Sequence, residues 1–216
     1  MSAALFWSGG KDSLLALDRA QRQNLAVTHL INIFDEHSGR VRFHGIRKEL
    51  IDAQAQSLGK VLLQQGTAPA AFETTFAGLL EAAKQQGVQE VVFGNIHLAD
   101  VRAWYEQRTT QQGFRHHEPL WGGEPAHLLQ EFIERGHRAQ ITSVYLDHGG
   151  RPEWLGREFT TAFLEELKSA EDVDVCGERG EYHSFSFAGP LFADEVPVRP
   201  TGRFHAEGHL ILDLAA

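Results

Sequence analysis

Two glycines and a lysine stand together near the start of the chain, in the run SGGKDS over residues 8–13. Adjacent glycines let a backbone turn sharply and let another molecule approach its N–H groups. Between a strand and a helix, these N–H groups and the positive helix end form an anion cradle, to which Lys11 adds a charge. Phosphate is the anion that fits best. The plainer alternative is a tight turn with Asp12 or Ser13 as helix cap, which accounts for one polar residue only.

Two common phosphate-binding loops do not match this run. The mononucleotide loop needs a glycine five residues before its Gly-Lys pair, where this chain has Leu5, and a Ser or Thr after the lysine, where it has Asp12. The dinucleotide pattern G-x-G-x-x-G also fails, because Gly9 and Gly10 are adjacent. The run therefore indicates a phosphate site of another type.

A second group of reactive side chains lies far along the chain, in VCGERGEYHSFSFAGPLF over residues 175–192. Its carboxylates could hold an ammonium ion, and a carboxylate or an imidazole could take a proton from it. If residues 182–187 form a strand, Glu181 and His183 point to the same face. The alternative is a charged turn that leads into an edge strand, since Glu and His are common on surfaces. Cys176 has no evident base beside it and is interpreted as a packed small residue.

The elements that must position these residues alternate between strand and helix patterns. Strands are expected over residues 3–7, 26–34, 60–64, 90–96 and 139–145, and helices over 12–23, 47–58, 72–86 and 127–135. This alternation predicts an α/β fold with a doubly wound, mainly parallel sheet, and it puts residues 8–13 at the carboxyl edge of the sheet, where ligands bind. Beyond it, a helix over 158–168 and strands over 182–187 and 209–214 predict a smaller α+β extension. We expect residues 1–147 to form the main domain and residues 148–216 to complete the substrate site without being an independent domain.

Composition limits the class of protein. The 216 residues carry a net charge of −9, which argues against general nucleic-acid binding. No apolar run is long enough to cross a membrane, and the N-terminus has no signal-peptide pattern, so we expect a cytoplasmic protein. The single cysteine suits a reducing compartment. The twelve histidines lack the Cys or carboxylate spacing of a zinc site.

Two motifs carry a resemblance to a known family. The run SGGKDS resembles the SGGxDS signature of the PP-loop ATP pyrophosphatases, and the block over residues 175–192 resembles the CGExGEYxTF…GPLF block of the diphthine–ammonia ligase family. The short phrases GNI (94–96), PLW (119–121) and LG (155–156) also stand where that family has similar elements. The resemblance thus spans nearly the whole chain.

The resemblance implies a Rossmann-like fold of the adenine nucleotide alpha hydrolase type, with ATP and Mg²⁺ as cofactors. Its implied nucleotide-binding residues are Ser8, Gly9, Gly10, Lys11, Asp12, Ser13, Ile33, Gly94 and Asn95, and Asp12 is also the implied magnesium ligand. Its implied catalytic residues are Lys11, Glu178, Glu181 and His183. Relatives often carry Asp at position 95, so Asn95 removes a possible metal ligand or base, and the alternative is a turn residue at a strand end.

The resemblance also implies a reaction: ATP adenylates a carboxylate with release of pyrophosphate, and ammonia then displaces AMP to give an amide. The implied partners are ATP, ammonia and a carboxylate, which is diphthine on elongation factor 2 if the chain is archaeal or eukaryotic. A bacterial relative would act on another small carboxylate. Whether the chain forms a homodimer is left open. One rival is a non-catalytic ATP- or AMP-binding protein. Another is an RNA-modifying PP-loop enzyme, which the acidic charge and the chain length disfavour.

Overall fold

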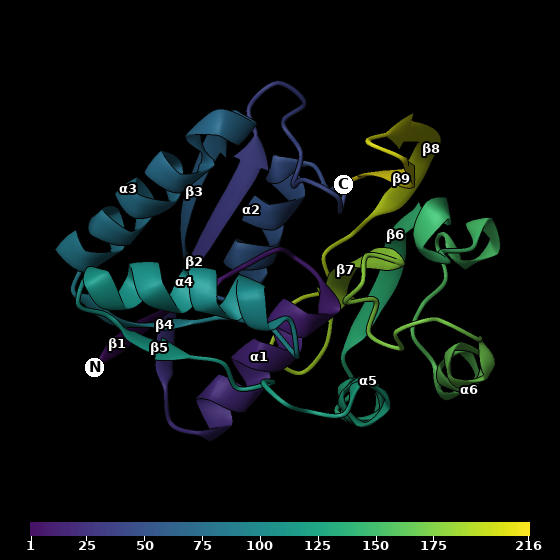
Figure 1. Cartoon of the computed structure of the whole chain (residues 1–216), viewed down its shortest axis with the longest axis horizontal. Coiled ribbons are helices and arrows are strands. Elements are labelled where there is room, and N and C mark those ends of the chain that lie inside the picture. Colours follow the sequence, from purple (N-terminus) through teal and green to yellow (C-terminus); the bar gives the residue numbers. More distant parts are fainter.

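Five parallel strands form a sheet in the first part of the chain (Figure 1). The computed structural model describes all residues from Met1 to Ala216. The strands are β1 (Ser2–Phe6), β2 (Ala26–Asp35), β3 (Val61–Thr67), β4 (Val88–Val92) and β5 (Arg115–His117), in the order β3-β2-β1-β4-β5. The central strand β1 is apolar on both faces, because helices cover both sides of the sheet.

Four helices cover the two faces of this sheet: α1 (Lys11–Arg22), α2 (Lys48–Ser57), α3 (Phe72–Gln85) and α4 (Ala99–Gln111). Alternate residues of β1 belong to two separate hydrophobic clusters. Ala3 and Leu5 pack in the cluster that contains α1 and α2, whereas Ala4 packs with Phe76 of α3 and Tyr105 of α4. The sheet is therefore doubly wound, and the predicted fold class is confirmed.

A second, antiparallel sheet follows (Figure 1). Its strands are β6 (Arg138–Tyr145), β7 (Tyr182–Ala188), β8 (Arg199–Ala206) and β9 (His209–Ala215), in the order β7-β6-β9-β8. Helices α5 (Pro125–Glu134) and α6 (Thr161–Ser169) belong to the same part of the chain as this sheet. The strand expected over 139–145 therefore exists, but placing it in the parallel sheet was wrong. The fifth parallel strand is β5, whose three polar residues carry no hydrophobic pattern.

The two sheets meet along β7 and the loop before α1. The backbone N–H of Ser186 donates to the carbonyl oxygen of Gly9 at 2.8 Å, and Gln54 of α2 donates to the carbonyl oxygens of both residues. One hydrophobic cluster includes Leu14 of α1 and Phe185 of β7, so a single core joins both sheets. This contact brings the C-terminal motif next to residues 8–13.

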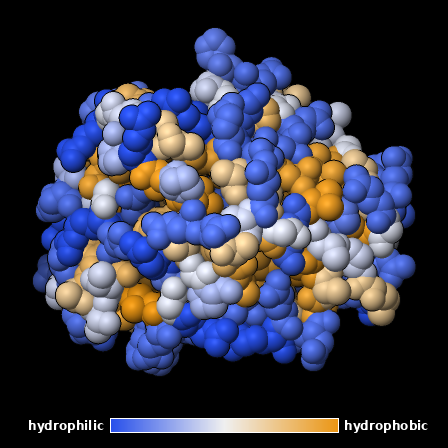
Figure 2. All heavy atoms as spheres, turned by 180° about the vertical axis from the view of Figure 1, so that it is seen from behind, coloured by the Kyte–Doolittle hydropathy of each residue, from blue (hydrophilic) through white to orange (hydrophobic).

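The outer surface is largely hydrophilic on the face turned away from the view of Figure 1, with apolar atoms exposed in patches between polar ones (Figure 2). None of the helices is both long enough and apolar enough to span a bilayer.

Candidate active site

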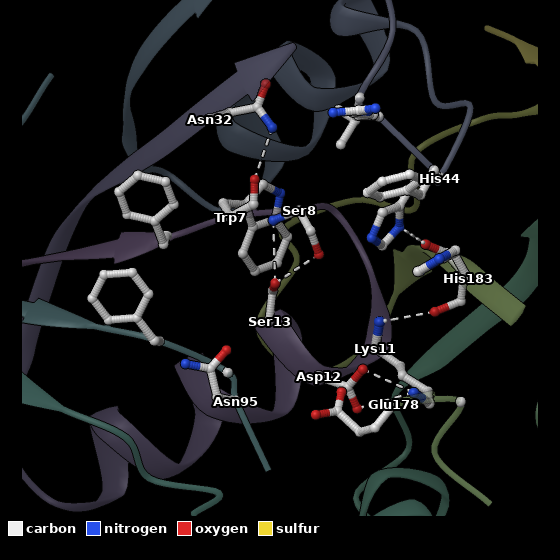
Figure 3. Close-up of a pocket in the computed structure, with 18 of the residues that line it drawn as sticks. Trp7, Ser8, Lys11, Asp12, Ser13, Asn32, His44, Asn95, Glu178 and His183 are labelled. Carbon is white, nitrogen blue, oxygen red and sulfur yellow. Dashed lines mark hydrogen bonds and ion pairs between the residues drawn. The ribbon is translucent and has the colours of Figure 1, made fainter. Parts of the chain in front are cut away.

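A cavity of about 520 Å³ opens where the loop after β1 meets the C-terminal motif (Figure 3). Its wall includes residues from 6–13, 32–33, 41–44, 93–98 and 176–184, so both sequence motifs contribute to it. Ligand pockets typically have volumes of about 300–1,000 Å³. The cavity also lies at the carboxyl ends of parallel strands, which is where open α/β sheets bind ligands.

The turn into α1 leaves three hydrogen-bond donors free. The backbone N–H groups of Gly9, Asp12 and Ser13 donate to no other residue, whereas that of Ser8 donates to Ser13 Oγ at 3.2 Å. Ser8, Asp12 and Ser13 all line the cavity. Free N–H groups at the positive end of a helix attract anions. The free N–H groups of this turn therefore suit an anion, and phosphate binding by the turn stays a prediction.

The two glycines of this turn allow it to pack tightly. Gly9 has a φ of +86°, and a Cβ there would lie 2.6 Å from Ile51 Cδ1. A Cβ on Gly10 would lie 3.2 Å from the carbonyl oxygen of Ser184 in β7. Neither glycine lines the cavity. The backbone N–H of Gly10 donates to Ser8 Oγ at 3.3 Å, whereas that of Gly9 has no partner in the protein.

Lys11 is a buried cation that joins the two motifs. Its Nζ donates to the Asp12 carboxylate at 2.8 and 3.0 Å and to the carbonyl oxygen of Cys176, and it lies 5.1 Å from the centre of the Tyr182 ring. Burial alone would lower the pKa of Lys11, but Asp12 and Tyr182 raise it well above its ordinary value. The side chain is therefore protonated and holds the C-terminal loop against the first turn of α1.

Glu178 also lines the cavity, and Figure 3 shows its side chain beside those of Asp12 and Lys11. Its Oε2 accepts a 3.4 Å hydrogen bond from the backbone N–H of Ile96. Burial, and then the negative charge of Asp12, raise the pKa of Glu178 to about 7. A carboxyl group with this pKa exchanges protons readily near neutral pH, which suits a general acid or base.

His183 also lines the cavity, and its ring nitrogens have no hydrogen-bond partner in the protein. Burial, and then His44 and His209, hold its pKa well below the ordinary value, so the ring is neutral. His44 lies with its ring centre 4.6 Å from that of His183, and its Nδ1 donates to the carbonyl oxygen of Ser184 at 3.1 Å. His44 belongs to no motif, and no sequence signal singles it out.

Glu181 does not reach the cavity, in contrast to Glu178 and His183. It precedes β7, and its side chain is fully buried in the neighbouring loop. Its Oε1 accepts from the N–H of Asp174 at 2.5 Å, and its Oε2 accepts from the N–H of Arg179 at 3.1 Å. The expectation that Glu181 and His183 share a face is therefore wrong. The geometry assigns Glu181 to the support of the loop that carries Glu178.

The support by Glu181 has a measurable consequence. We expect Glu181→Gln to lower the free energy of unfolding by about 1–3 kcal/mol, because an amide NH₂ would face one of the two buried N–H donors. In a chain of this size the melting temperature would fall by roughly 2–12 °C. The matched control is Glu165→Gln, which changes an exposed glutamate paired with Lys168 at the surface. Equal melting temperatures for the two variants would contradict the support role.

The cavity is also lined by Ile33, Gly94 and Asn95, which the family resemblance implies for nucleotide binding. A Cβ on Gly94 would lie 3.1 Å from the backbone of Asp12, so glycine lets the loop after β4 approach α1 closely. Asn95 Nδ2 donates to Glu118 Oε1 at 2.8 Å. This bond uses one N–H of the amide, and the amide oxygen of Asn95 has no hydrogen-bond partner in the protein.

The part of the cavity next to β1, β2 and β4 is apolar. The rings of Phe6 and Phe93 stack with their centres 5.1 Å apart, and Ile33, Phe72 and Tyr105 complete this region. A flat, weakly polar group fits against such a surface. The cavity thus has an apolar end and an anion-binding end.

Two protein-family models match this chain, one in each of its two parts. Residues 1–116 match the diphthamide synthase N-terminal domain, and residues 124–214 match the diphthamide synthase C-terminal domain. The chain belongs to the diphthamide synthase family. The cavity lies at the junction of the two matched segments, since the first supplies residues 8–13 and the second supplies Glu178 and His183.

Two curated relatives of this chain are named diphthine–ammonia ligase. The diphthine–ammonia ligase of Danio rerio is 32% identical over 84 residues, which cover 38% of this chain and 33% of that protein. The diphthine–ammonia ligase of Bos taurus is 34% identical over 85 residues, which cover 37% of this chain and 30% of that protein. The matched stretch thus spans about a third of the length of these relatives.

Proposed function

We propose that this diphthamide synthase family member is an ATP-dependent carboxylate–ammonia ligase that forms AMP and pyrophosphate. The observation that carries the proposal is the shared cavity. It joins the free N–H donors of the first α1 turn to Glu178 and His183, which stand more than 160 residues later in the chain. The names of the matched relatives support an amide-forming ligase.

The cavity fits ATP by shape and chemistry. The adenine would lie against the apolar end near Ile33, and the phosphates would accept from the N–H groups of Gly9, Asp12 and Ser13. Asn95 would add an acceptor oxygen on the nucleotide side.

Magnesium fits this arrangement through the phosphates of ATP. No group of three or more His, Cys, Asp or Glu side chains is arranged to hold a metal ion. Asp12 is the carboxylate closest to the anion-binding turn, so we propose that Asp12 and phosphate oxygens share the ion, in keeping with the oxygen ligands that Mg²⁺ prefers. The ion would neutralise charge on the pyrophosphate.

The first step is adenylation. An oxygen of the acceptor carboxylate attacks the α-phosphorus of ATP, the bond between that phosphorus and the bridging oxygen breaks, and pyrophosphate leaves with the electron pair. Negative charge grows on the leaving group in the transition state. The Lys11 cation and the free N–H donors of Gly9, Asp12 and Ser13 would stabilise this charge from fixed positions, which is electrostatic preorganisation.

The second step is amide formation. Ammonium gives up one proton to a base, and the nitrogen attacks the acyl carbon. The bond from that carbon to the AMP oxygen breaks, AMP leaves with the electron pair, and the nitrogen loses a second proton to solvent to give the neutral amide. A base next to the anion-binding turn must accept the first of these protons. Glu178 suits this role because its pKa of about 7 makes it a stronger base than an ordinary carboxylate. The neutral rings of His183 and His44 also line the cavity, and His183 is the alternative base that the sequence motif includes.

The acceptor is a carboxylate, and the names of the matched relatives point to diphthine. Elongation factor 2 would carry it in an archaeal or eukaryotic cell, whereas a free small carboxylate would replace it in a bacterial one. The cytoplasm is the proposed location of either reaction.

Product analysis tests the proposal. Incubation with ATP, Mg²⁺, ammonium and a carboxylate should yield AMP and pyrophosphate in equal amounts and no ADP. Because adenylation precedes the use of ammonia, labelled pyrophosphate should exchange into ATP when ammonium is omitted. Formation of ADP would exclude adenylation, and tight ATP binding without any turnover would favour a nucleotide-binding protein instead.

A further inference from the structure

Glu118 is a buried carboxylate that lies outside the cavity and bonds to one of the residues that line it. Its side chain is 2% exposed and directly follows β5. Its Oε1 accepts from Asn95 Nδ2 at 2.8 Å and lies 2.9 Å from His116 Nε2. Asn95 lines the cavity, whereas Glu118 and His116 do not. Glu118 therefore acts on the cavity through Asn95.

Arg102 of α4 holds the other oxygen of Glu118. Its Nε lies 3.4 Å from Glu118 Oε2, and its guanidinium lies 4.5 Å from the centre of the Trp121 ring. A carboxylate accepts hydrogen bonds and donates none, so the atom of Asn95 that faces Glu118 must be the amide nitrogen. Glu118 thus fixes which way the Asn95 amide is turned.

The amide oxygen of Asn95 is consequently turned away from Glu118. Figure 3 shows this oxygen on the side of Ser13 and the amide nitrogen on the opposite side. The oxygen has no hydrogen-bond partner in the protein. An acceptor held in one orientation before a ligand arrives selects a ligand group that donates a hydrogen bond.

The position of Asn95 along the cavity indicates which group this is. Phe93, two residues earlier, stacks on Phe6 at the apolar end. Gly94 packs on the turn at the anion-binding end, where its Cβ would lie 3.2 Å from the backbone nitrogen of Ser13. Asn95 thus lies where the two ends of the cavity meet. In an ATP molecule that spans both ends, the part between base and phosphates is the ribose, whose hydroxyl groups are donors.

We propose that Glu118 is a positioning residue, which turns the Asn95 amide so that its oxygen accepts from a ribose hydroxyl of ATP. This inference rests on the proposed function for the identity of the nucleotide, and it adds a residue that selects the sugar. A deoxy sugar offers no group to the Asn95 oxygen. A fluorine in place of the hydroxyl offers only a second acceptor, which the oxygen repels.

The test measures dissociation constants by calorimetry with Mg²⁺ and without ammonium. ATP is compared with four analogues that carry hydrogen or fluorine in place of the 2′ or the 3′ hydroxyl. For the hydroxyl that bonds to Asn95, the deoxy analogue should bind roughly 2- to 13-fold more weakly than ATP, the range of one hydrogen bond. The fluoro analogue should bind more weakly still. Asn95→Ala should bring ATP and the deoxy analogue within about twofold, and it reports the effect of fluorine on the sugar alone.

Glu118→Gln should reverse the order of the deoxy and fluoro analogues. Arg102 still needs an acceptor, so the new amide would turn its oxygen to Arg102 and its NH₂ group to Asn95. Asn95 would then turn its own NH₂ group to the ribose, and fluorine can accept from it. The fluoro analogue should therefore bind more tightly than the deoxy analogue. A purely structural role of Glu118 would weaken every nucleotide by the same factor.

The matched control for Glu118→Gln is Glu106→Gln. Glu106 also pairs with Arg102, at 3.6 Å, but it does not bond to Asn95 and does not line the cavity. Glu106→Gln should keep the order of affinities that the wild type shows.

The inference and the ligase function fail in different ways. Equal affinities of the wild type for ATP and both deoxy analogues, or the wild-type order of analogues in Glu118→Gln, would overturn the positioning role, and pyrophosphate exchange would still uphold the ligase. Selection of the ribose that depends on Asn95 and Glu118, without pyrophosphate exchange, would uphold the positioning role and contradict the ligase.

Discussion

Replacing Glu178 by glutamine should slow amide formation by ~100- to 10,000-fold, the usual contribution of a general base. The ATP affinity should change by less than about threefold, because the carboxylate bonds to the N–H of Ile96 and not to the anion-binding turn. Single-turnover measurement of amide, together with a separate titration of ATP, separates the two effects. Equal losses in ATP affinity and in rate would mean that Glu178 binds the nucleotide rather than acting as a base.

A change of nucleophile from ammonium to hydroxylamine provides a control for the role of Glu178 as a base. Hydroxylamine is largely neutral at about pH 8 and needs no base to become nucleophilic, so Glu178→Gln should form the hydroxamate at nearly the wild-type rate. The same pair of nucleophiles tested on His183→Asn decides between the two bases. If His183→Asn shows the ammonium-specific loss and Glu178→Gln does not, the base is His183.

The pH profile gives Glu178 a second readout. Its pKa of about 7 means that the carboxylate form, which accepts the proton, increases as the pH rises through 7. The wild-type rate should rise over this interval, and Glu178→Gln should keep only the more alkaline rise that comes from free ammonia.

The raised pKa of Glu178 should also make the stability of the protein depend on pH when no substrate is present. The pKa in the folded state exceeds the ordinary value of 4.5, so the neutral carboxyl group is favoured by burial. Its contribution to stability is fully present below about pH 4.5 and is lost as the pH rises through about 7. Glu178→Gln stays neutral throughout. Its melting temperature relative to wild type should therefore increase from pH 5 to pH 8.

Local chemistry explains which features the sequence could predict. The turn at residues 8–13 follows from its own glycines and polar residues, and the parallel sheet follows from alternating apolar strands and amphipathic helices. Helix α4 has only Thr109 buried and therefore shows no apolar stripe. Strand β8 is almost wholly exposed and carries no alternation to detect. The sequence does not predict these two elements, because neither carries a hydrophobic pattern.

The site itself shows where sequence reasoning stops. Glu178 and Glu181 stand in one glycine-rich motif, and their residue types cannot say which carboxylate faces a ligand. The answer depends on how the loop closes, since two backbone N–H groups take up the Glu181 carboxylate. The pairing of the His44 and His183 rings depends on a contact between the loop after β2 and strand β7 of the other sheet. These contacts join residues that lie far apart in the sequence, so only the tertiary structure reveals them.

Replacing Lys11 by methionine should have the second large effect, on both stability and turnover. The substitution keeps most of the apolar stem and removes the cation that bonds to Asp12 and to the carbonyl oxygen of Cys176. Loss of one partner of a buried ion pair costs about 3–5 kcal/mol. We expect the lower end of this range, because the Asp12 side chain is 28% exposed and is partly solvated. The melting temperature should fall by roughly 6–12 °C.

Turnover and stability can be separated with a second substitution. Lys11→Met leaves the Asp12 carboxylate without its cation, whereas Lys11→Met combined with Asp12→Asn removes both charges, so the double variant should recover much of the lost stability. Adenylation should not recover, because the double variant still lacks the charge that stabilises departing pyrophosphate and also lacks the Asp12 carboxylate proposed to share the magnesium ion. The lost cation alone should cost ~100- to 1,000-fold in rate. Pyrophosphate exchange measured well below each melting temperature keeps unfolding out of the comparison. If the double variant regained both stability and exchange, Lys11 would serve only to neutralise Asp12, and the backbone N–H groups of the turn alone would hold the leaving pyrophosphate.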